Sequence, residues 1–338
     1  DMLNPDVFAR KLRRNLEDKL VLLEKADPEV VKKVMNHPHL ENGAFYDSKK
    51  IFNIDAIIET YRQYGKELKE LLTDTNSFVQ IQKDRGKKIL LEGAQGHMLS
   101  IDYGSYPFVT SSDCSIPGLA KGCGLKESDV DLVLGIVKAF YMTRVGEGPF
   151  PTELGGEESA KWCSSHTRAD EEREYPGVTV NDSDEFGQGI AIRKVGGEYG
   201  ATTGRPRRTG WLDLPLLRYA KITNGSNVIL TKLDVLNDCD TIKICDSYTY
   251  HGQPYNLGRS LLENGTILRE TIPDIEVMKN CTPNYSLFPG WKSNITDYKN
   301  YEALPRNLKN IINHIEFTAG VNARILSVGP EREQTILK

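Results

Sequence analysis

Residues 199–211 have the composition of an anion-binding loop. They read Tyr-Gly-Ala-Thr-Thr-Gly-Arg-Pro-Arg-Arg-Thr-Gly-Trp, with three glycines, three threonines, three arginines and no apolar face. Glycine lets the backbone approach a ligand closely, threonine supplies hydroxyl donors, and the planar guanidinium of arginine binds carboxylates and phosphates through paired hydrogen bonds. A basic turn that only faces water is the alternative, because runs of charge are usually solvated.

A second candidate is the tetrapeptide Thr-Lys-Leu-Asp at residues 231–234, which follows an apolar run that we predict to be a buried strand. This places it at the carboxyl edge of a sheet, where α/β proteins bind ligands. A carboxylate there can accept two hydrogen bonds from the N1–H and 2-amino groups of guanine, while the lysine stem lies along the ring. The tetrapeptide is similar to the Asn-Lys-x-Asp element of GTP-binding proteins, with Thr in place of Asn. A strand that ends in a solvated ion pair is the alternative.

Two further turns of small residues could contact a nucleotide. Gln95 lies in a turn with glycines at both ends, residues 93–96, and the hydroxyl side chains of residues 110–112 follow it; residues 327–330 follow the last predicted strand. Each is equally consistent with an ordinary turn or loop. The sequence contains no Gly-x-x-x-x-Gly-Lys-Ser/Thr motif. A phosphate cradle must therefore come from elsewhere.

The overall composition is that of a soluble globular protein without a basic surface. Of 338 residues, 39% are hydrophobic and 27% charged, and the net charge is -4. This balance does not provide the excess of basic side chains that binding to nucleic acid phosphates requires. No apolar run is long enough to cross a bilayer and residues 1–5 lack the features of a signal peptide, so we expect a cytoplasmic protein without a membrane partner. The cysteines and histidines show no zinc-binding spacing.

Hydrophobic periodicity predicts helices that alternate with strands. Helices are expected from Pro5, after Asn53, and at about 129–141, 212–222 and 305–317; strands are expected at 88–92, 227–231, 241–245 and 324–328. The polar residues 155–196 are expected to be a surface insertion. We predict an α/β fold in which a large, mostly parallel β-sheet is flanked by helices. Residues 1–338 are expected to form one domain, with a mainly helical portion at 1–80 and the sheet-containing core at 81–338.

Read together and in order, the motifs closely resemble the adenylosuccinate synthetase family. The matching segments are residues 93–96, 106–112, 143–154, 200–211, 231–234 and 327–330. The resemblance runs from about residue 1 to the C-terminus and is broken mainly at 155–196. It implies a P-loop-NTPase-like synthetase fold. It also implies a GTP-dependent ligase that joins IMP and L-aspartate, through a 6-phosphoryl-IMP intermediate, to give adenylosuccinate, GDP and phosphate.

The resemblance also implies a role for individual residues. Those expected to contact IMP are Gln95, Thr110 and Arg205. Those expected to bind aspartate are Ala201, Thr202, Thr203, Gly204, Arg205 and Arg207. Those expected to bind GTP are Arg207, Lys232, Leu233, Asp234, Ser327, Val328 and Gly329.

The resemblance further implies Mg²⁺ as a cofactor and a homodimer as the assembly. The family's glycine-rich phosphate loop, with its catalytic aspartate and histidine, has no counterpart in the sequence. We therefore expect neither catalytic residues nor metal ligands in this chain, and no turnover by it alone. His97 and the other histidines are not placed to replace the acid. Two alternatives remain: a guanine-nucleotide-binding regulatory module without chemistry, and an ATP-using carbon-nitrogen ligase, which Lys232 and Asp234 disfavour.

Overall fold

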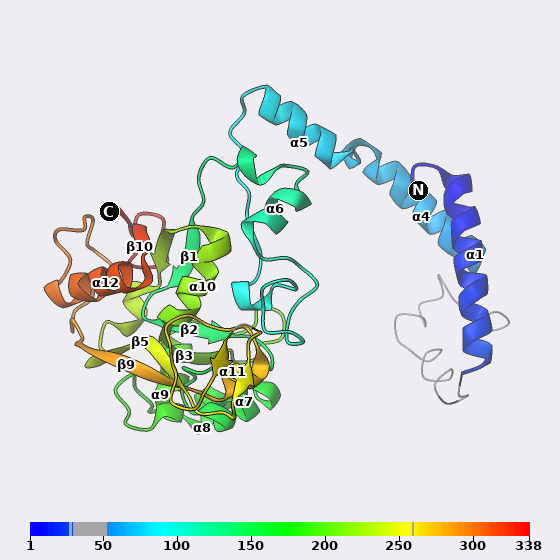
Figure 1. Cartoon of the computed structure of the whole chain (residues 1–338). Coiled ribbons are helices and arrows are strands. Elements are labelled where there is room, and N and C mark those ends of the chain that lie inside the picture. The colour runs from blue at the N-terminus through cyan, green and yellow to red at the C-terminus, as the bar shows by residue number, and fades with distance from the viewer. Residues whose placement is uncertain (27–28, 30–52, 259) are drawn as a thin grey trace. The chain divides into compact units, whose positions relative to one another are not determined.

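The computed structural model describes residues 1–26, 29, 53–258 and 260–338 (Figure 1). The chain divides into two compact units, Asp1–Phe78 and Val79–Lys338. The expected single domain remains a prediction. None of the helices within the described ranges has the length and apolar character needed to span a membrane.

The described part of the first unit is helical. It contains α1 (Pro5–Glu24), α4 (Ile54–Leu68), a short 3-10 helix (Lys69–Leu71) and the start of α5 (Thr75–Asp84). α1 packs on α4, with the Phe8 and Tyr61 rings stacked at 5.5 Å. The Asn53 side chain caps α4 by accepting from the Ala56 amide at 3.1 Å. Leu71 lies in the 3-10 helix that follows α4 and is 76% exposed.

The second unit contains a mostly parallel four-stranded sheet. Its strand order is β1-β4-β10-β11, and both β1 and β10 run parallel to β4 while β11 is antiparallel. The strands are β1 (Gly135–Lys138), β4 (Asn227–Thr231), β10 (Asn322–Ser327) and β11 (Thr335–Leu337). Parallel pairing brings the carboxyl ends of β1, β4 and β10 to one edge, where Lys138 pairs with Thr231.

A second sheet, mainly antiparallel, lies in the same unit. Its path is β2-β3-β5-β8, and β9 also pairs with β5. The strands are β2 (Tyr141–Arg144), β3 (Arg208–Asp213), β5 (Thr241–Tyr250), β8 (Ile267–Leu268) and β9 (Cys281–Pro289), and a separate pair is formed by β6 (Tyr255–Asn256) and β7 (Leu261–Leu262). β3 is buried along its whole length. It therefore anchors the end of the arginine-containing segment that precedes it.

Helices cover the sheets of the second unit (Figure 1). α10 contacts both β5 and α12, and α12 also contacts β9 and β10. The helices are α6 (Ile116–Gly122), α7 (Gly156–Ser165), α8 (Arg168–Glu174), α9 (Glu185–Gly196), α10 (Leu214–Asn224), α11 (Ile275–Lys279) and α12 (Arg306–Ala319). The predicted α/β fold, with a mostly parallel sheet flanked by helices, is confirmed.

Two predicted elements are wrong. The expected helix at 129–141 is instead a 3-10 turn (Glu127–Asp129) followed by β1 and the start of β2. The β-branched residues of this stretch favour strand, and β4 supplies a parallel partner. The expected strand at 88–92 does not form; Leu90 is 91% exposed, and no described strand pairs with this segment.

The polar residues 155–196, expected at the surface, form α7, α8 and α9. Most of α9 is buried, so the expected surface location is wrong for this helix. The reason is that part of the charge is satisfied inside the protein, because Arg193 forms an ion pair with Glu171 and both side chains are fully buried.

Candidate functional site

The carboxyl edge of the four-stranded sheet carries most of the residues expected to bind GTP. Lys232 and Asp234 follow β4, and Ser327 to Gly329 follow β10, its parallel neighbour. Lys232 has a left-handed backbone, with φ of 58°. The Ser327 hydroxyl donates to the Gly329 carbonyl at 2.9 Å, which closes a tight turn. The topology thus brings these two segments to the same edge.

Asp234 is half-buried at this edge. Burial raises the pKa of its carboxyl group, and the positive charge of Lys232 acts in the opposite direction. A partly desolvated carboxylate forms stronger hydrogen bonds with a ligand than one in bulk water. The position therefore suits a ligand that presents N–H donors, as guanine does.

Glu198 joins the arginine-containing loop to this edge. Its buried carboxylate accepts from the Arg207 guanidinium at 2.7 Å, from Lys138 Nζ at 2.9 Å and from the Tyr141 hydroxyl at 2.8 Å. Lys232 Nζ lies 3.3 Å from the second carboxylate oxygen. Three cations therefore surround one carboxylate, and the cluster carries excess positive charge that suits a phosphate or carboxylate ligand.

The charge of Glu198 follows from its surroundings. Burial alone would raise the pKa of this carboxyl group, but Lys138, Tyr141 and Lys232 together lower it from its usual 4.5 to about 2. Burial in turn lowers the pKa of Lys138, although Glu198 opposes this. Glu198 is consequently ionised at neutral pH. Its carboxylate contacts both Arg207 and Lys232 and so keeps these two cations close together.

The arginine loop, defined here as residues 200–207, is a compact turn. The Gly200 amide donates to the Arg205 carbonyl at 2.8 Å, and the Gly204 amide donates to the Gly200 carbonyl at 2.8 Å. Gly204 has φ of 65°, which glycine adopts without strain. Ala201, Thr202 and Thr203 are exposed, as is Arg205.

The two arginines of this loop differ in their surroundings. Arg207 is partly buried on Glu198. Within the ranges that the structure describes, the Arg205 guanidinium makes no ion pair or hydrogen bond. Arg205 therefore presents its donors to solvent, where they are available to an anionic ligand.

Gln95 and Thr110 form a separate group. The Cys114 thiol lies 3.9 Å from Gln95 Oε1, and the Thr110 hydroxyl donates to the Leu99 carbonyl at 3.0 Å. Burial raises the pKa of Cys114, while the Thr110 hydroxyl lowers it. Among the described residues, no hydrogen bond or ion pair joins this group to Arg205. The structure thus brings Arg207 and Lys232 to the carboxylate of Glu198, and it places the turn after β10 at the same sheet edge. A cavity shared with Gln95 remains a prediction.

Sequence reasoning missed Glu198, Lys138 and Tyr141. Glu198 directly precedes residues 199–211, so a carboxylate beside a basic loop was the available signal. Lys138 and Tyr141 were assigned to a helix, which hid their position at the ends of β1 and β2. Across the described ranges, no group of three or more His, Cys, Asp or Glu side chains could hold a metal ion.

The fold is that of an α/β protein with a cluster of cationic side chains at the carboxyl edge of its four-stranded sheet. A family model described as adenylosuccinate synthetase matches residues 1–336, and the chain belongs to the adenylosuccinate synthetase family. The resemblance inferred from the motifs is confirmed.

Individual relatives agree with this assignment. The chain is 38% identical, over its whole length, to the adenylosuccinate synthetases of Trichlorobacter lovleyi and Geobacter sulfurreducens, of which it covers 64% and 63%. It is also similar to the fully ligated adenylosuccinate synthetase of Plasmodium falciparum, with a TM-score of 0.69 and 32% identity, and it covers 65% of that chain. The chain thus spans just under two thirds of the length of these relatives.

Proposed function

We propose that this chain takes part in the GTP-dependent joining of IMP and L-aspartate, which yields adenylosuccinate, GDP and phosphate. The observation that supports this most directly is the position of Glu198. It holds Arg207, from the loop suited to anions, beside Lys232, from the turn suited to guanine. A ligase of this kind needs a nucleotide site and a carboxylate site next to each other.

The guanine base would be bound by Lys232, Leu233 and Asp234, together with Ser327, Val328 and Gly329. Asp234 would accept from the N1–H and the 2-amino group, which distinguishes guanine from adenine. Arg207 would reach the phosphates of GTP. The excess positive charge around Glu198 would favour these phosphates electrostatically.

Aspartate would be bound by residues 201–205 and Arg207, whose amides, hydroxyls and guanidinium groups match its two carboxylates. Gln95, Thr110 and Arg205 would contact IMP. In the reaction, IMP gives up its N1 proton and its O6 takes the γ-phosphoryl group from GTP, which gives GDP and 6-phosphoryl-IMP. The aspartate amine then attacks C6, the C6–O6 bond breaks, phosphate leaves, and the amine gives up a proton.

The described residues would contribute position and positive charge to these steps. We assign none of them the role of general base or acid. Magnesium dependence, a homodimer and a cytoplasmic location are further proposals that rest on the family. No step is assigned to a metal.

Calorimetric titration tests the proposal. We expect the chain to bind GTP in preference to ITP, and to bind IMP with an affinity that aspartate changes. Binding of GTP without any effect of IMP or aspartate would contradict the ligase and support the regulatory module instead. Binding of ATP in preference to GTP would contradict the roles of Lys232 and Asp234.

A further inference from the structure

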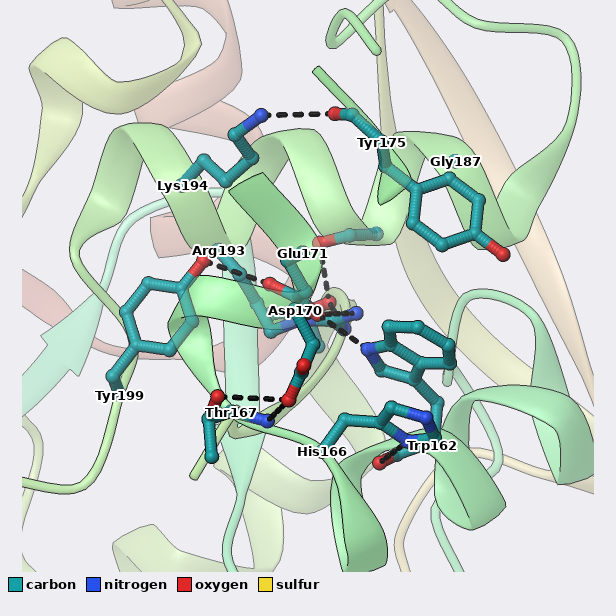
Figure 2. Close-up of polar contacts among 12 residues, drawn as sticks. Trp162, His166, Thr167, Asp170, Glu171, Tyr175, Gly187, Arg193, Lys194 and Tyr199 are labelled. Carbon is teal, nitrogen blue, oxygen red and sulfur yellow. Dashed lines mark hydrogen bonds and ion pairs between the residues drawn. The ribbon is translucent and has the colours of Figure 1, made fainter. Parts of the chain in front are cut away.

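A buried polar cluster lies beside the arginine loop (Figure 2). At its centre is Glu171 of α8, whose side chain is fully buried, as is that of Arg193 from α9. Glu171 Oε1 accepts from Arg193 Nε at 2.9 Å, from Arg193 Nη2 at 2.7 Å and from Trp162 Nε1 at 3.1 Å. Glu171 Oε2 accepts from the Tyr199 hydroxyl at 2.7 Å. One carboxylate thus receives four hydrogen bonds from three side chains.

This cluster holds both ends of the arginine loop. Tyr199 directly precedes the loop, and its hydroxyl is bound by Glu171. Thr209, in β3, follows the loop, and its hydroxyl accepts from Arg193 Nη1 at 3.2 Å. The Glu171–Arg193 ion pair therefore connects the incoming and the outgoing strand of the turn.

The start of α8 also contacts the arginine loop and the aromatic ring of Tyr199, which directly precedes this loop. The Arg168 amide donates to the Gly204 carbonyl at 3.2 Å, and the Arg168 guanidinium lies 5.5 Å from the centre of the Tyr199 ring. α8 is itself fixed at both ends. Asp170 accepts from the Thr167 amide and hydroxyl at its start, and Lys194 of α9 donates to the Tyr175 carbonyl at its end (Figure 2).

A contribution to stability is not the only role that such a cluster can have. The desolvation of a buried ion pair cancels much of its attraction, and well-packed apolar side chains often stabilise a protein equally well. Directional hydrogen bonds do something that apolar packing does not, because they fix the orientation of the groups they join. Here the joined groups are the two ends of a loop that carries Arg205 and Arg207.

We propose that Glu171 is a positioning residue, which sets the conformation of the arginine loop through Tyr199 and Arg193. Its consequence for ligands rests on the proposed function, because the loop is proposed to bind the carboxylates of aspartate. Guanine binding at Lys232 and Asp234 would not depend on Glu171, since its hydrogen bonds go to Arg193, Trp162 and Tyr199. Arg207, proposed to reach the GTP phosphates, is held separately by the Glu198 carboxylate at 2.7 Å and the Glu198 carbonyl at 2.9 Å. GTP affinity is therefore expected to stay unchanged when only the Glu171 contacts are removed.

Substitution of Tyr199→Phe tests the positioning role with little disturbance, because it removes only the hydroxyl bound by Glu171. Tyr175→Phe is the matched control: Tyr175 packs against Trp162 in the same cluster, and among the described residues its hydroxyl has no hydrogen-bond partner. We expect hydrogen exchange at the amides of residues 200–205 to rise about tenfold in Tyr199→Phe and to stay within about twofold in Tyr175→Phe. Exchange in β4 and β10 should stay unchanged. Equal exchange in the two variants would overturn the proposal.

Ligand binding provides a second, separate readout. In Tyr199→Phe, the affinity for aspartate in the presence of IMP should fall about tenfold while the affinity for GTP stays the same. Glu171→Gln should show the same pattern more strongly if it folds. A parallel loss of GTP affinity would indicate general destabilisation and overturn the proposal. If the unsubstituted chain binds no aspartate, the proposed function fails, and the exchange measurement still decides whether Glu171 positions the loop.

Discussion

The carboxylate of Glu198 binds the guanidinium of Arg207 at 2.7 Å, at the point where the arginine loop returns to the sheet. The backbone repeats this connection, because the Arg207 amide donates to the Glu198 carbonyl at 2.9 Å. Lys232 lies 3.3 Å from the same carboxylate. A single buried residue therefore determines how the loop suited to anions and the turn suited to guanine lie relative to each other.

Replacement of this carboxylate should destabilise the protein in a pH-dependent way. Glu198→Gln leaves Arg207, Lys138 and Lys232 without their buried partner, and we expect the free energy of unfolding at pH 7 to fall by about 3 kcal/mol. The folded-state pKa is lowered to about 2, so the contribution of Glu198 is present above pH 4.5 and is lost as the pH falls toward 2.

Urea unfolding between pH 7 and pH 3 measures this contribution. The difference between the original protein and Glu198→Gln should shrink as the pH falls. Glu157→Gln is the control, since Glu157 on α7 is exposed and has no ion pair within the described residues. A difference that is constant with pH would show that the charge of Glu198 is unimportant.

Arg205 should affect aspartate and IMP but not guanine. Its guanidinium is exposed and free of ion pairs in the described part of the chain. Arg205→Leu therefore removes hydrogen-bond donors that only a ligand would use. We expect the affinities for aspartate and IMP to fall at least tenfold, because hydrogen bonds to charged groups contribute ~1.5–3 kcal/mol. Arg306→Leu, an exposed arginine on α12, serves as the control. Calorimetry that finds the GTP preference lost as well would contradict these separate roles.

Asp234 should control the choice of base. Asp234→Asn replaces an acceptor for the N1–H and 2-amino groups of guanine by an amide that also donates. The preference for GTP over ITP or XTP should therefore decrease by about tenfold or more, while aspartate binding remains. Competition titrations with the three nucleotides measure this. A substrate profile identical to that of Arg205→Leu would mean that the division of roles is wrong.

Asp213 predicts a pH effect of the opposite sign. Its side chain caps α10 by accepting from the Leu216 amide at 3.0 Å, and burial raises its pKa to about 6 although the Tyr248 hydroxyl acts against this. A raised carboxyl pKa means that the folded state holds the proton more tightly, so stability falls as the pH rises from about 4 through 6. Asp213→Asn should remove this loss, and asparagine is also a good helix cap.

The expected gain in unfolding free energy for Asp213→Asn is up to about 3 kcal/mol at pH 7, with little or none at pH 4. Urea unfolding at the two pH values provides the comparison. An equal destabilisation at both would show that the hydrogen-bond acceptor, rather than the charge, matters at this position.

Elements with a clear local pattern were predicted correctly from the sequence, and an element that depends on a distant partner was not. β4 and β10 were predicted because their apolar runs are short and end in small residues. The position of Lys232 and Asp234 at the sheet edge was predicted because they directly follow β4, and their role in binding guanine remains a prediction. The helix predicted at 129–141 was wrong, because part of this segment forms β1 and its parallel partner β4 lies far along the chain. Local sequence carries no signal for such a partner.

Glu198 was missed for a similar reason. Its partners Tyr141 and Lys138 lie 57 and 60 positions away, and only the fold brings them to it. The buried pair of Glu171 and Arg193 belongs to a segment that was expected at the surface. Composition alone does not show that charges 22 positions apart neutralise each other inside the protein.

A crystal structure of the chain soaked with IMP and GDP tests the central claim most directly, namely that the arginine loop and the carboxyl edge of the sheet line one site. We predict that guanine lies against the Lys232 stem with its N1–H and 2-amino group on Asp234, and that Arg207 contacts the phosphates. Guanine bound elsewhere, or an Arg207 that stays on Glu198 remote from the nucleotide, would contradict the account.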